Sequence, residues 1–424
     1  MQQKKISAND KVRIALIGCG GMGSGDLRNE LSIPGVELAA CCDIYTGRLE
    51  RAKEIWGNKI LLTRDHREVL ARPDIDAVLV ATPDHWHSAI TTEALKAGKH
   101  VYCQKPMVHT LDEGKPVIEA HKKSGKILQI GSQYASSLAF LKARDLFRGG
   151  AIGELNMVEA WLDRNSAIGA WQYSIPPDAS PQTVDWDRFL GKAPKRPFEA
   201  MRLFRWRNYN DYGTGVAGDL FVHLFTGIHT VTGALGPTRV FATGGLRFWK
   251  DGRDAPDVML SLVDYPKTDA HPAFTLSLKV NFVSGGVRES FGIRFVGSEG
   301  VMTPTMNSLT LSRTPRETEP GYTISTFPKD VQAQFLKEYR AKYPQSTPNA
   351  DSIRPETTEV FNPPPSHNPH REHHVHFQNA IRTGKAHFED GVFGFRTAGP
   401  ALLCNLSYFE KRVVGWDPLN MNVV

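Results

Sequence analysis

A lysine and an aspartate–histidine pair are the residues of this chain best suited to moving protons. Lys105 precedes a proline and closely follows the apolar, strand-like run 100–103. Asp219 and His223 are four residues apart after a glycine-rich stretch, so on a helix their side chains would share one face. An imidazole titrates near neutrality and can accept a hydroxyl proton, while a carboxylate can orient it. Oxidation of a secondary alcohol would need such a set.

Each of these residues also has a purely structural interpretation. Lys105 could be an exposed loop lysine, because the proline after it mainly fixes a turn. Asp219 and His223 could be a helix cap and a hydrogen-bonded core histidine. The choice depends on whether the fold brings the three residues to one ligand site.

A dinucleotide-binding motif is the clearest sign of such a site. A strand-like run, 12–17, leads into Gly18-Cys19-Gly20-Gly21-Met22-Gly23, and a second apolar run ends at Asp43. In a Rossmann fold these glycines would form the turn, admit the pyrophosphate and let the next helix pack closely, while the acid would bind the ribose diol. Asp43 favours NAD over NADP, because a carboxylate repels a 2′-phosphate; the nearby Arg48 makes this preference weaker. The alternative is a glycine-rich turn with Asp43 as a helix cap.

The order of strand and helix signals predicts an α/β chain with two domains. Strand-like runs at 38–42, 75–81, 100–103 and 127–131 alternate with helical patterns, which predicts a doubly wound parallel sheet over residues 1–133. Residues 134–424 change character: a helix at 137–148 precedes longer alternating strands, typical of an α+β domain with a mixed or antiparallel sheet. The predicted strands of this domain are 155–162, 239–243, 258–264, 274–282 and 291–297, and its predicted C-terminal helices are 372–382 and 392–411.

Polar residues follow the fourth and fifth predicted strands, where a Rossmann fold binds its ligand. These are the segment 82–87 and the segment 104–106. His85 and His87 could equally be helix-start residues. The residues predicted to contact the cofactor are Gly18, Cys19, Gly20, Gly21, Met22, Gly23, Asp43, Thr82, Pro83, His85, His87, Gln104, Lys105 and Gln133.

An aromatic and basic group before Asp219 is suited to binding sugars. Tryptophan and tyrosine faces stack on sugar rings, while arginine and aspartate bind hydroxyl groups, although a packed interface would use the same residues. The residues predicted to contact the substrate are Arg164, Trp206, Tyr209, Tyr212, Asp219 and His223. Two long proline-containing segments, 166–202 and 303–371, are predicted to be insertions that serve as a lid or a packing arm.

Composition excludes several classes of protein. The chain has 424 residues, of which 41% are hydrophobic and 23% charged, and its net charge of +6 is spread over mixed-sign segments, so nucleic-acid binding is not expected. No apolar run is long enough to span a membrane. The five cysteines are not in spaced pairs, which predicts free thiols. Residues 1–10 are a polar lead-in that could replace an export signal, so a cytoplasmic and a periplasmic location both remain open.

The histidine-dense segment 367–376 raises the question of a metal. His370 with His374, or His373 with His376, could share a helical face. No cysteine or carboxylate pattern completes a recognised zinc spacing, so we expect a polar helix start and no metal site.

Together these motifs resemble the glucose-fructose oxidoreductase, inositol dehydrogenase and MocA (Gfo/Idh/MocA) family over nearly the whole chain. The matching features are the glycine motif, Asp43, Thr82-Pro83 with His87, Lys105-Pro106, Asp219 with His223, Gly297-Ser298-Glu299-Gly300 and Trp416-Asp417. The resemblance implies NAD as cofactor, Lys105 and His223 as the catalytic proton-handling pair and Asp219 as a catalytic and substrate-binding partner. It also implies an open, mainly antiparallel second sheet used in a homo-oligomer, a dimer or a tetramer. One departure is Gln104, where the family usually has glutamate; its neutral side chain would leave the Lys105 cation less stabilised.

The function implied is an NAD-dependent oxidoreductase acting on a secondary hydroxyl of a sugar, glycoside or polyol. The alternative is a redox-neutral NAD-dependent glycosidase, which cleaves glycosides by transient oxidation, elimination and re-reduction. A binding protein that kept the fold and lost turnover is a third possibility, disfavoured by the presence of Lys105, Asp219 and His223.

Overall fold

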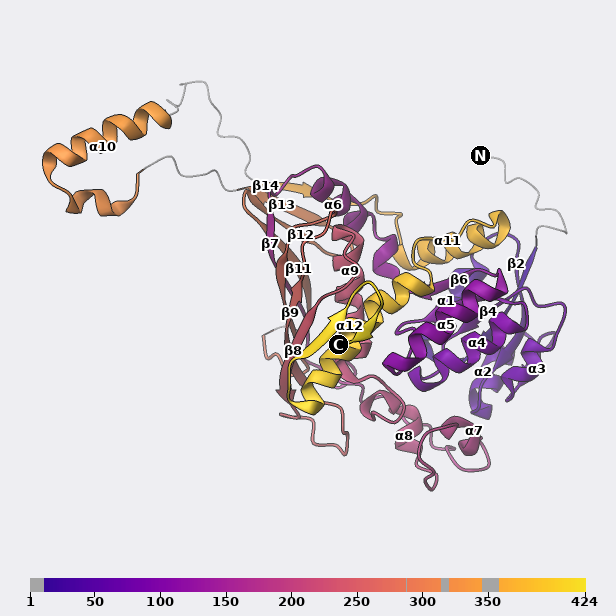
Figure 1. The fold of residues 1–424 in the computed structure, drawn as a ribbon. Coiled ribbons are helices and arrows are strands. Elements are labelled where there is room, and N and C mark those ends of the chain that lie inside the picture. Colours follow the sequence, from indigo (N-terminus) through magenta and orange to yellow (C-terminus); the bar gives the residue numbers. More distant parts are fainter. Residues whose placement is uncertain (1–10, 287, 314–319, 345–357) are drawn as a thin grey trace.

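Two β-sheets, joined by a layer of helices, make up the body of the protein (Figure 1). The computed structural model describes residues 11–286, 288–313, 320–344 and 358–424. The polar lead-in 1–10 and parts of the predicted insertion 303–371 therefore lie outside the described residues. Within the described part, no helix is both long enough and apolar enough to cross a bilayer.

The N-terminal sheet is a parallel Rossmann sheet of six strands in the order β3-β2-β1-β4-β5-β6. Its inner strands are buried at nearly every position, as expected when helices cover both faces. The strands are β1 (Val12–Ile17), β2 (Val36–Cys42), β3 (Leu61–Thr63), β4 (Ala77–Val80), β5 (His100–Gln104) and β6 (Leu128–Gly131). The helices are α1 (Gly21–Leu31), α2 (Thr46–Trp56), α3 (His66–Leu70), α4 (His87–Lys96) and α5 (Gly114–Ser124).

The second sheet has ten strands in the order β14-β13-β12-β11-β7-β10-β9-β8-β15-β16. Only the β7–β10 pair is parallel, and burial alternates along β9 and β10, so one face is packed and the other is open. The strands are β7 (Leu155–Arg164), β8 (Arg239–Gly245), β9 (Val258–Tyr265), β10 (Phe274–Asn281), β11 (Glu289–Gly297), β12 (Gly300–Pro304), β13 (Leu309–Arg313), β14 (Thr358–Phe361), β15 (Val414–Asp417) and β16 (Asn422–Val423).

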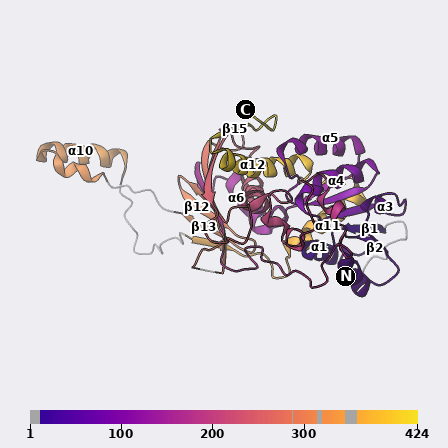
Figure 2. The same cartoon turned by 90° about the horizontal axis from the view of Figure 1, so that it is seen from below.

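Helices α6, α9 and α12 cover the packed face and stand between the two sheets (Figures 1 and 2). Helix α11 instead packs on α1 of the Rossmann domain, so the chain returns to its first domain near its end. The remaining helices are α6 (Leu138–Arg148), α7 (Trp186–Leu190), α8 (Ala200–Phe204), α9 (Val222–Thr232), α10 (Lys329–Lys342), α11 (Pro369–Thr383) and α12 (Gly391–Glu410).

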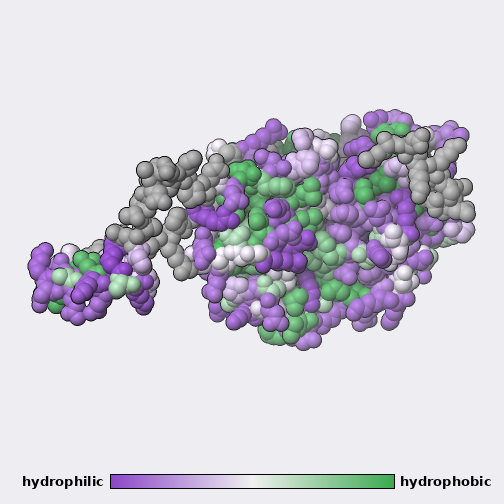
Figure 3. Space-filling view, turned by 90° about the horizontal axis from the view of Figure 1, so that it is seen from above, coloured by the Kyte–Doolittle hydropathy of each residue, from purple (hydrophilic) through white to green (hydrophobic). Residues whose placement is uncertain are grey.

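The predicted fold class is confirmed, including the five longer strands predicted in the second domain. The interpretation of 303–371 as one insertion is wrong, because β13 and β14 from this segment extend the large sheet. Between them, helix α10 has no buried residue and stands away from the body (Figures 1 and 3). Hydrophobic side chains gather on its surface among hydrophilic ones (Figure 3). All five cysteines are free and buried, as expected.

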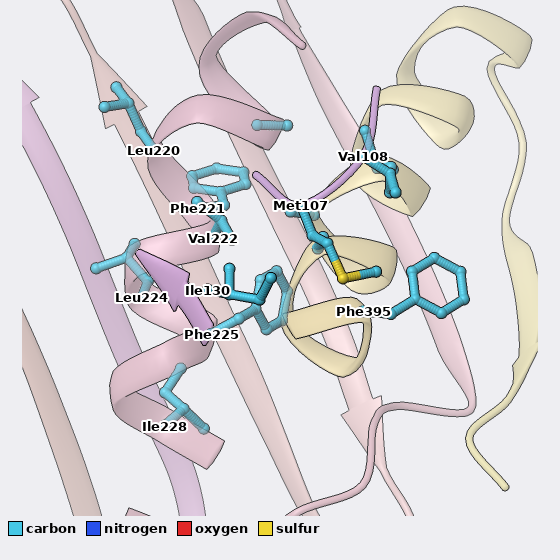
Figure 4. Packing of buried hydrophobic residues seen from close by; sticks show 14 of the residues in the cluster. Met107, Val108, Ile130, Leu220, Phe221, Val222, Leu224, Phe225, Ile228 and Phe395 are labelled. Atoms are coloured by element: carbon cyan, nitrogen blue, oxygen red, sulfur yellow. The ribbon is translucent and has the colours of Figure 1, made fainter. Parts of the chain in front are cut away.

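One hydrophobic core runs through both domains. It includes Val78 and Val80 of the Rossmann sheet together with Leu276 and Leu278 of the large sheet. At its centre, Met107 and Ile130 lie beside residues of α9 and α12, as Figure 4 shows for Phe225 and Phe395.

The segment 166–207, here called the crossing segment, leaves the second domain after β7 and packs against the Rossmann domain. Val184 forms an antiparallel bridge with Tyr45, and the main chain of Thr46 donates to Thr183 O at 2.9 Å. Near α4, the indole of Trp86 donates to Phe189 O at 2.9 Å. The predicted insertion 166–202 is thus a packing arm across the cofactor domain.

Candidate functional site

A cavity of about 800 Å³ opens at the carboxyl ends of the Rossmann strands, bounded by the second domain and the crossing segment. It brings together most of the residues predicted from the sequence. Those that line it are Gly18, Gly20, Gly21, Met22, Asp43, Thr82, Pro83, His87, Gln104, Lys105, Gln133, Arg164, Trp206, Asp219 and His223.

Five of the predicted site residues do not line this cavity. Cys19 is buried beneath the loop, and Gly23 lies within α1 against the main chain of residue 18. His85 is partly buried, with Nε2 at 2.8 Å from Phe189 O. Tyr209 and Tyr212, predicted to contact substrate, lie instead in an apolar cluster with Phe189. Aromatic composition alone did not separate the tyrosines that pack from the tryptophan that faces the cavity.

The glycine loop has the close packing that the motif requires. A Cβ on Gly23 would lie 2.1 Å from Gly18 O, and Gly18 itself has a φ of +98°, which favours glycine. In contrast, a Cβ on Gly21 would have no neighbour within 4 Å. Helix α1 begins at Gly21 without a side-chain cap. The loop therefore leaves an open helix N-terminus, which suits a phosphate.

Asp43 shapes this loop from the end of β2. Its Oδ2 accepts from the main chain of Cys19 at 2.8 Å, and its Oδ1 accepts from Tyr45 N at 2.9 Å. A carboxylate has about four acceptor positions, so these two bonds leave room for ribose hydroxyls. Arg48 Nη1 lies 3.5 Å from Asp43 Oδ2, beside the position that a ribose would occupy.

Lys105 is held by Asp219 at the opposite end of the cavity. Lys105 Nζ donates to Asp219 O at 2.8 Å and to Asp219 Oδ1 at 3.0 Å, and Arg207 Nε donates to the same Oδ1 at 3.1 Å. Burial lowers the pKa of Lys105, and the Asp219 charge opposes that effect. Burial would raise the pKa of Asp219, but Lys105 and Arg207 together hold it well below its usual range. This is a buried ion cluster, which excludes the interpretation of Lys105 as an exposed loop residue.

His223 lies one helical turn after Asp219, across a change of helix type. Residues 217–221 form a π-helical turn, and α9 begins at Val222. Such turns are often found at functional sites. Nδ1 of His223 is buried and has no hydrogen-bond partner among the described residues. Burial, reinforced by the Lys105 charge, lowers the pKa of His223 well below its usual value. A neutral imidazole with an unpaired nitrogen can accept a proton.

Two buried side chains fix the strand ends around Lys105. The His87 ring lies between two carbonyl oxygens, with Nδ1 2.7 Å from Pro106 O and Nε2 2.8 Å from Thr82 O. Asp84 accepts from both the main chain and the hydroxyl of Thr214, at 3.0 and 2.7 Å. His87 thus connects the ends of β4 and β5, and Asp84 attaches the turn before Asp219 to the Rossmann domain.

The unusual Gln104 belongs to a buried network that extends to α11. Gln104 Nε2 donates to Asp26 Oδ2 at 2.7 Å, and Asp26 Oδ1 lies 3.2 Å from His374 Nε2. On the other side of the imidazole, Nδ1 lies 2.9 Å from Glu30 Oε1. Burial alone would lower the pKa of His374, but its hydrogen bonds to Asp26 and Glu30 raise the pKa to about 9. A glutamate at position 104 would face the Asp26 carboxylate, so the amide is matched to its partner.

Exchanging the amide and the acid tests this matching. Gln104→Glu is expected to lower the free energy of unfolding by about 3 kcal/mol, because two buried carboxylates would meet. Adding Asp26→Asn should restore part of the loss, since the new amide can donate to the carboxylate introduced at position 104 while its oxygen accepts from His374. Denaturant unfolding of the two single variants and the double variant gives the coupling energy, expected to be about 0.5 to 3 kcal/mol in favour of the double variant. Strictly additive losses would contradict the matching.

Several cavity residues were not predicted from the sequence. The Tyr134 ring lies edge-on to the His223 ring with centroids 5.1 Å apart. Trp171 and Tyr173 come from the crossing segment. The many aromatic residues of 166–207 indicated that this segment could line a binding cavity. Only the fold shows which of these residues reach the cavity.

Comparison with known proteins identifies the N-terminal domain. Residues 12–132 match the model of an oxidoreductase family with an NAD-binding Rossmann fold, Gfo/Idh/MocA. Inositol 2-dehydrogenase of Salmonella typhimurium is 30% identical over 149 residues, which cover 35% of this chain and 44% of that enzyme. A glycosyl hydrolase family 109 protein of Shewanella baltica is 29% identical over 163 residues, 36% of this chain and 35% of that protein. The alignments thus span less than half of each relative.

Solved structures extend the likeness to the whole fold. Levoglucosan dehydrogenase, in complex with NADH and levoglucosan, superposes with a TM-score of 0.65 at 19% identity and covers 96% of this chain and 99% of that one. Aldose-aldose oxidoreductase from Caulobacter crescentus, complexed with glycerol, gives the same TM-score, identity and coverage. At this identity the likeness shows the two-domain fold.

Proposed function

We propose that the protein oxidises a secondary hydroxyl of a sugar, glycoside or polyol, because residues 12–132 match the NAD-binding Rossmann domain of the Gfo/Idh/MocA oxidoreductase family. The observation that supports this most directly is the position of Lys105, Asp219 and His223 in the cavity that the glycine loop opens into. Similar relatives act on such compounds by name, inositol 2-dehydrogenase among them.

The cavity residues are suited to binding NAD and to handling the substrate proton. The open N-terminus of α1 would hold the pyrophosphate, and Asp43 with its free acceptor positions would hold the adenosine ribose. When bound, NAD would supply the chemistry of hydride acceptance. The protein's own task is to remove the hydroxyl proton, and His223 or Lys105 would accept it. Asp219, which also accepts a hydrogen bond from Arg207, would hold Lys105 in position.

The substrate end of the cavity is suited to a polyhydroxylated ring. Tyr173 and Trp206 offer aromatic faces, while Arg164 and Glu289 offer charged groups that can bind hydroxyls. Arg164 Nε lies 3.4 Å from Glu289 Oε1, so the two form a polar pair from β7 and β11.

The redox-neutral glycosidase is the second candidate, and the crossing segment favours it. Thr183 and Val184 pair with the backbone of Thr46 and Tyr45, just after Asp43, the residue that would bind the cofactor's ribose. Exchange of the cofactor would therefore be slow if these contacts had to open. An enzyme that oxidises and re-reduces one sugar needs no such exchange. The 29% identity to the glycosyl hydrolase family 109 protein also supports this candidate.

One assay separates the two candidates. Purified protein is incubated with NAD and a panel of free sugars, polyols and aryl glycosides, and NADH absorbance and released aglycone are followed together. Growing NADH with intact glycoside supports the dehydrogenase. Aglycone release without net NADH supports the glycosidase. If neither signal arises while NAD binding is measured by calorimetry, the enzymatic proposal is wrong for these substrate classes.

We further propose that the protein forms a homo-oligomer through the open face of the large sheet. On this face, Phe241 and Leu262 pair across β8 and β9 and are 40% and 57% exposed, and Leu260 is 47% exposed. In the described part of the chain, the helices that pack on this sheet lie on the opposite face. An apolar sheet surface of this kind is typical of a subunit interface.

A further inference from the structure

Three histidines converge at a place that the proposed chemistry does not use. His373 and His376 come from α11, and His387 comes from the loop between α11 and α12. One ring nitrogen from each lies within 4.8 Å of the others. His373 is buried and the other two are partly exposed, so the cluster is reachable from solvent. The sequence shows no zinc-site spacing, because the third histidine, His387, comes from the loop that follows α11.

The His373 ring is oriented as a metal ligand would be. Its Nε2 lies 2.8 Å from Ile130 O, which can only accept, so the proton is on Nε2. Its Nδ1 therefore presents a lone pair, which now meets Ser136 Oγ at 2.8 Å. Metal-binding histidines usually donate their second nitrogen to a carbonyl or a carboxylate in this way.

A buried carboxylate lies behind the same ring. Glu389 Oε2 is 3.5 Å from His373 Nε2, and the Glu389 side chain is fully buried. Neither of its carboxylate oxygens has a hydrogen-bond partner among the described residues. A buried acid that accepts no hydrogen bond is costly to ionise, and a nearby cation would offset that cost. A carboxylate behind a histidine whose other nitrogen presents a lone pair is the arrangement that supports zinc in many proteins.

The other two rings complete a nitrogen donor set. The His376 and His387 rings are stacked with centroids 4.5 Å apart, and His376 Nδ1 lies 3.0 Å from Ser136 Oγ. An imidazole nitrogen is the commonest metal ligand that a protein side chain offers. On the exposed side, His376 Nε2 lies 3.7 Å from Glu372 Oε1, a further anionic neighbour.

We propose that His373, His376 and His387 form a zinc-class divalent cation site, with Glu389 supporting His373 from behind. Three imidazoles select Zn²⁺ and similar transition metals over Mg²⁺ and Ca²⁺, which prefer oxygen ligands. Binding would need small side-chain shifts, since Zn–N distances are about 2.0 to 2.1 Å. The cation would join α11 to the loop before α12 and, through Ser136, to the turn that carries Gln133 and Tyr134 into the cavity.

The test uses untagged full-length protein, stripped with a chelator and then titrated with Zn²⁺. We expect about one equivalent of bound zinc by elemental analysis, a higher Tm with Zn²⁺ than without, and a visible absorption spectrum for the Co²⁺ form. In His387→Ala the affinity should fall by at least about 100-fold, because a direct ligand is lost. Glu389→Gln should weaken binding by about 10-fold or more.

His121→Ala is the matched control. His121 is likewise partly exposed, and burial lowers its pKa, but it is not part of the cluster. This variant should bind zinc as the parent does. If His387→Ala does not fold, His376→Asn, at a partly exposed position, replaces it. Equal zinc binding by the parent and by the cluster variants, or no binding by the parent at micromolar Zn²⁺, would overturn the proposal.

Discussion

Replacement of Lys105 by methionine is expected to lower kcat by about 10² to 10⁴-fold, the usual contribution of a positioned proton-transfer group. Methionine keeps much of the apolar stem while removing the amine that Asp219 now binds at 3.0 Å. Lys99→Met is the matched control: Lys99 is also buried, and its Nζ donates to two main-chain oxygens, but outside the cavity. Steady-state kinetics of both variants, on the substrate that the panel assay identifies, make the comparison.

The control separates loss of chemistry from loss of fold. Lys99→Met should lower Tm and leave kcat close to that of the parent, whereas Lys105→Met should lose kcat while still binding NAD. Equal kcat losses in the two variants, or full activity in Lys105→Met, would count against a role for Lys105 in proton transfer.

Replacement of Asp219 by asparagine is expected to lower the free energy of unfolding by about 3 to 5 kcal/mol, because two largely buried cations lose their shared partner. Lys105 and Arg207 both donate to Asp219 Oδ1. The Lys105→Met/Asp219→Asn double variant should lose less than the sum of the single variants, since only Arg207 then remains unpaired. Denaturant unfolding of the four proteins gives this coupling energy, and additive losses would contradict the ion cluster.

The Asp219→Asn effect depends on pH in a defined direction. The pKa of Asp219 is held well below its usual range in the folded protein, so its contribution is fully present above the unfolded pKa of about 3.9. It is lost as the pH falls from that value through the folded pKa. The difference in stability between the parent and Asp219→Asn should therefore be constant near neutrality and shrink in acid. In the same variant the pKa of Lys105 should fall further, because the Asp219 charge that raises it is gone.

The glycine motif, the strand ends and the Asp219–His223 spacing were readable from the sequence because each is a local signal. A glycine loop after an apolar strand predicts a tight turn before a helix. Parallel strands then bring their carboxyl ends to one edge of the sheet. Lys105 and Asp219, 114 residues apart, could be paired only through the family resemblance.

The parts that sequence did not predict depend on contacts between distant segments. Asp26 and His374 are 348 residues apart, so the reason for Gln104 is invisible along the chain. Tyr209 and Tyr212 looked like sugar-binding residues, but side-chain type does not encode which way a loop faces. Likewise, β13 and β14 belong to a segment rich in proline and polar residues, and only pairing with the existing sheet edge makes them strands.

The continuous core restricts how the cavity can open. Apolar side chains of the Rossmann sheet and of the large sheet belong to one cluster, with α9 and α12 packed between them. A rigid-body hinge between the domains would have to expose this apolar surface, at about 25 cal/mol for each Å². Entry to the cavity would therefore depend on local movement at its rim, where the crossing segment is attached by backbone and side-chain hydrogen bonds and by a small apolar cluster. The two domains could then stay fixed relative to one another during turnover.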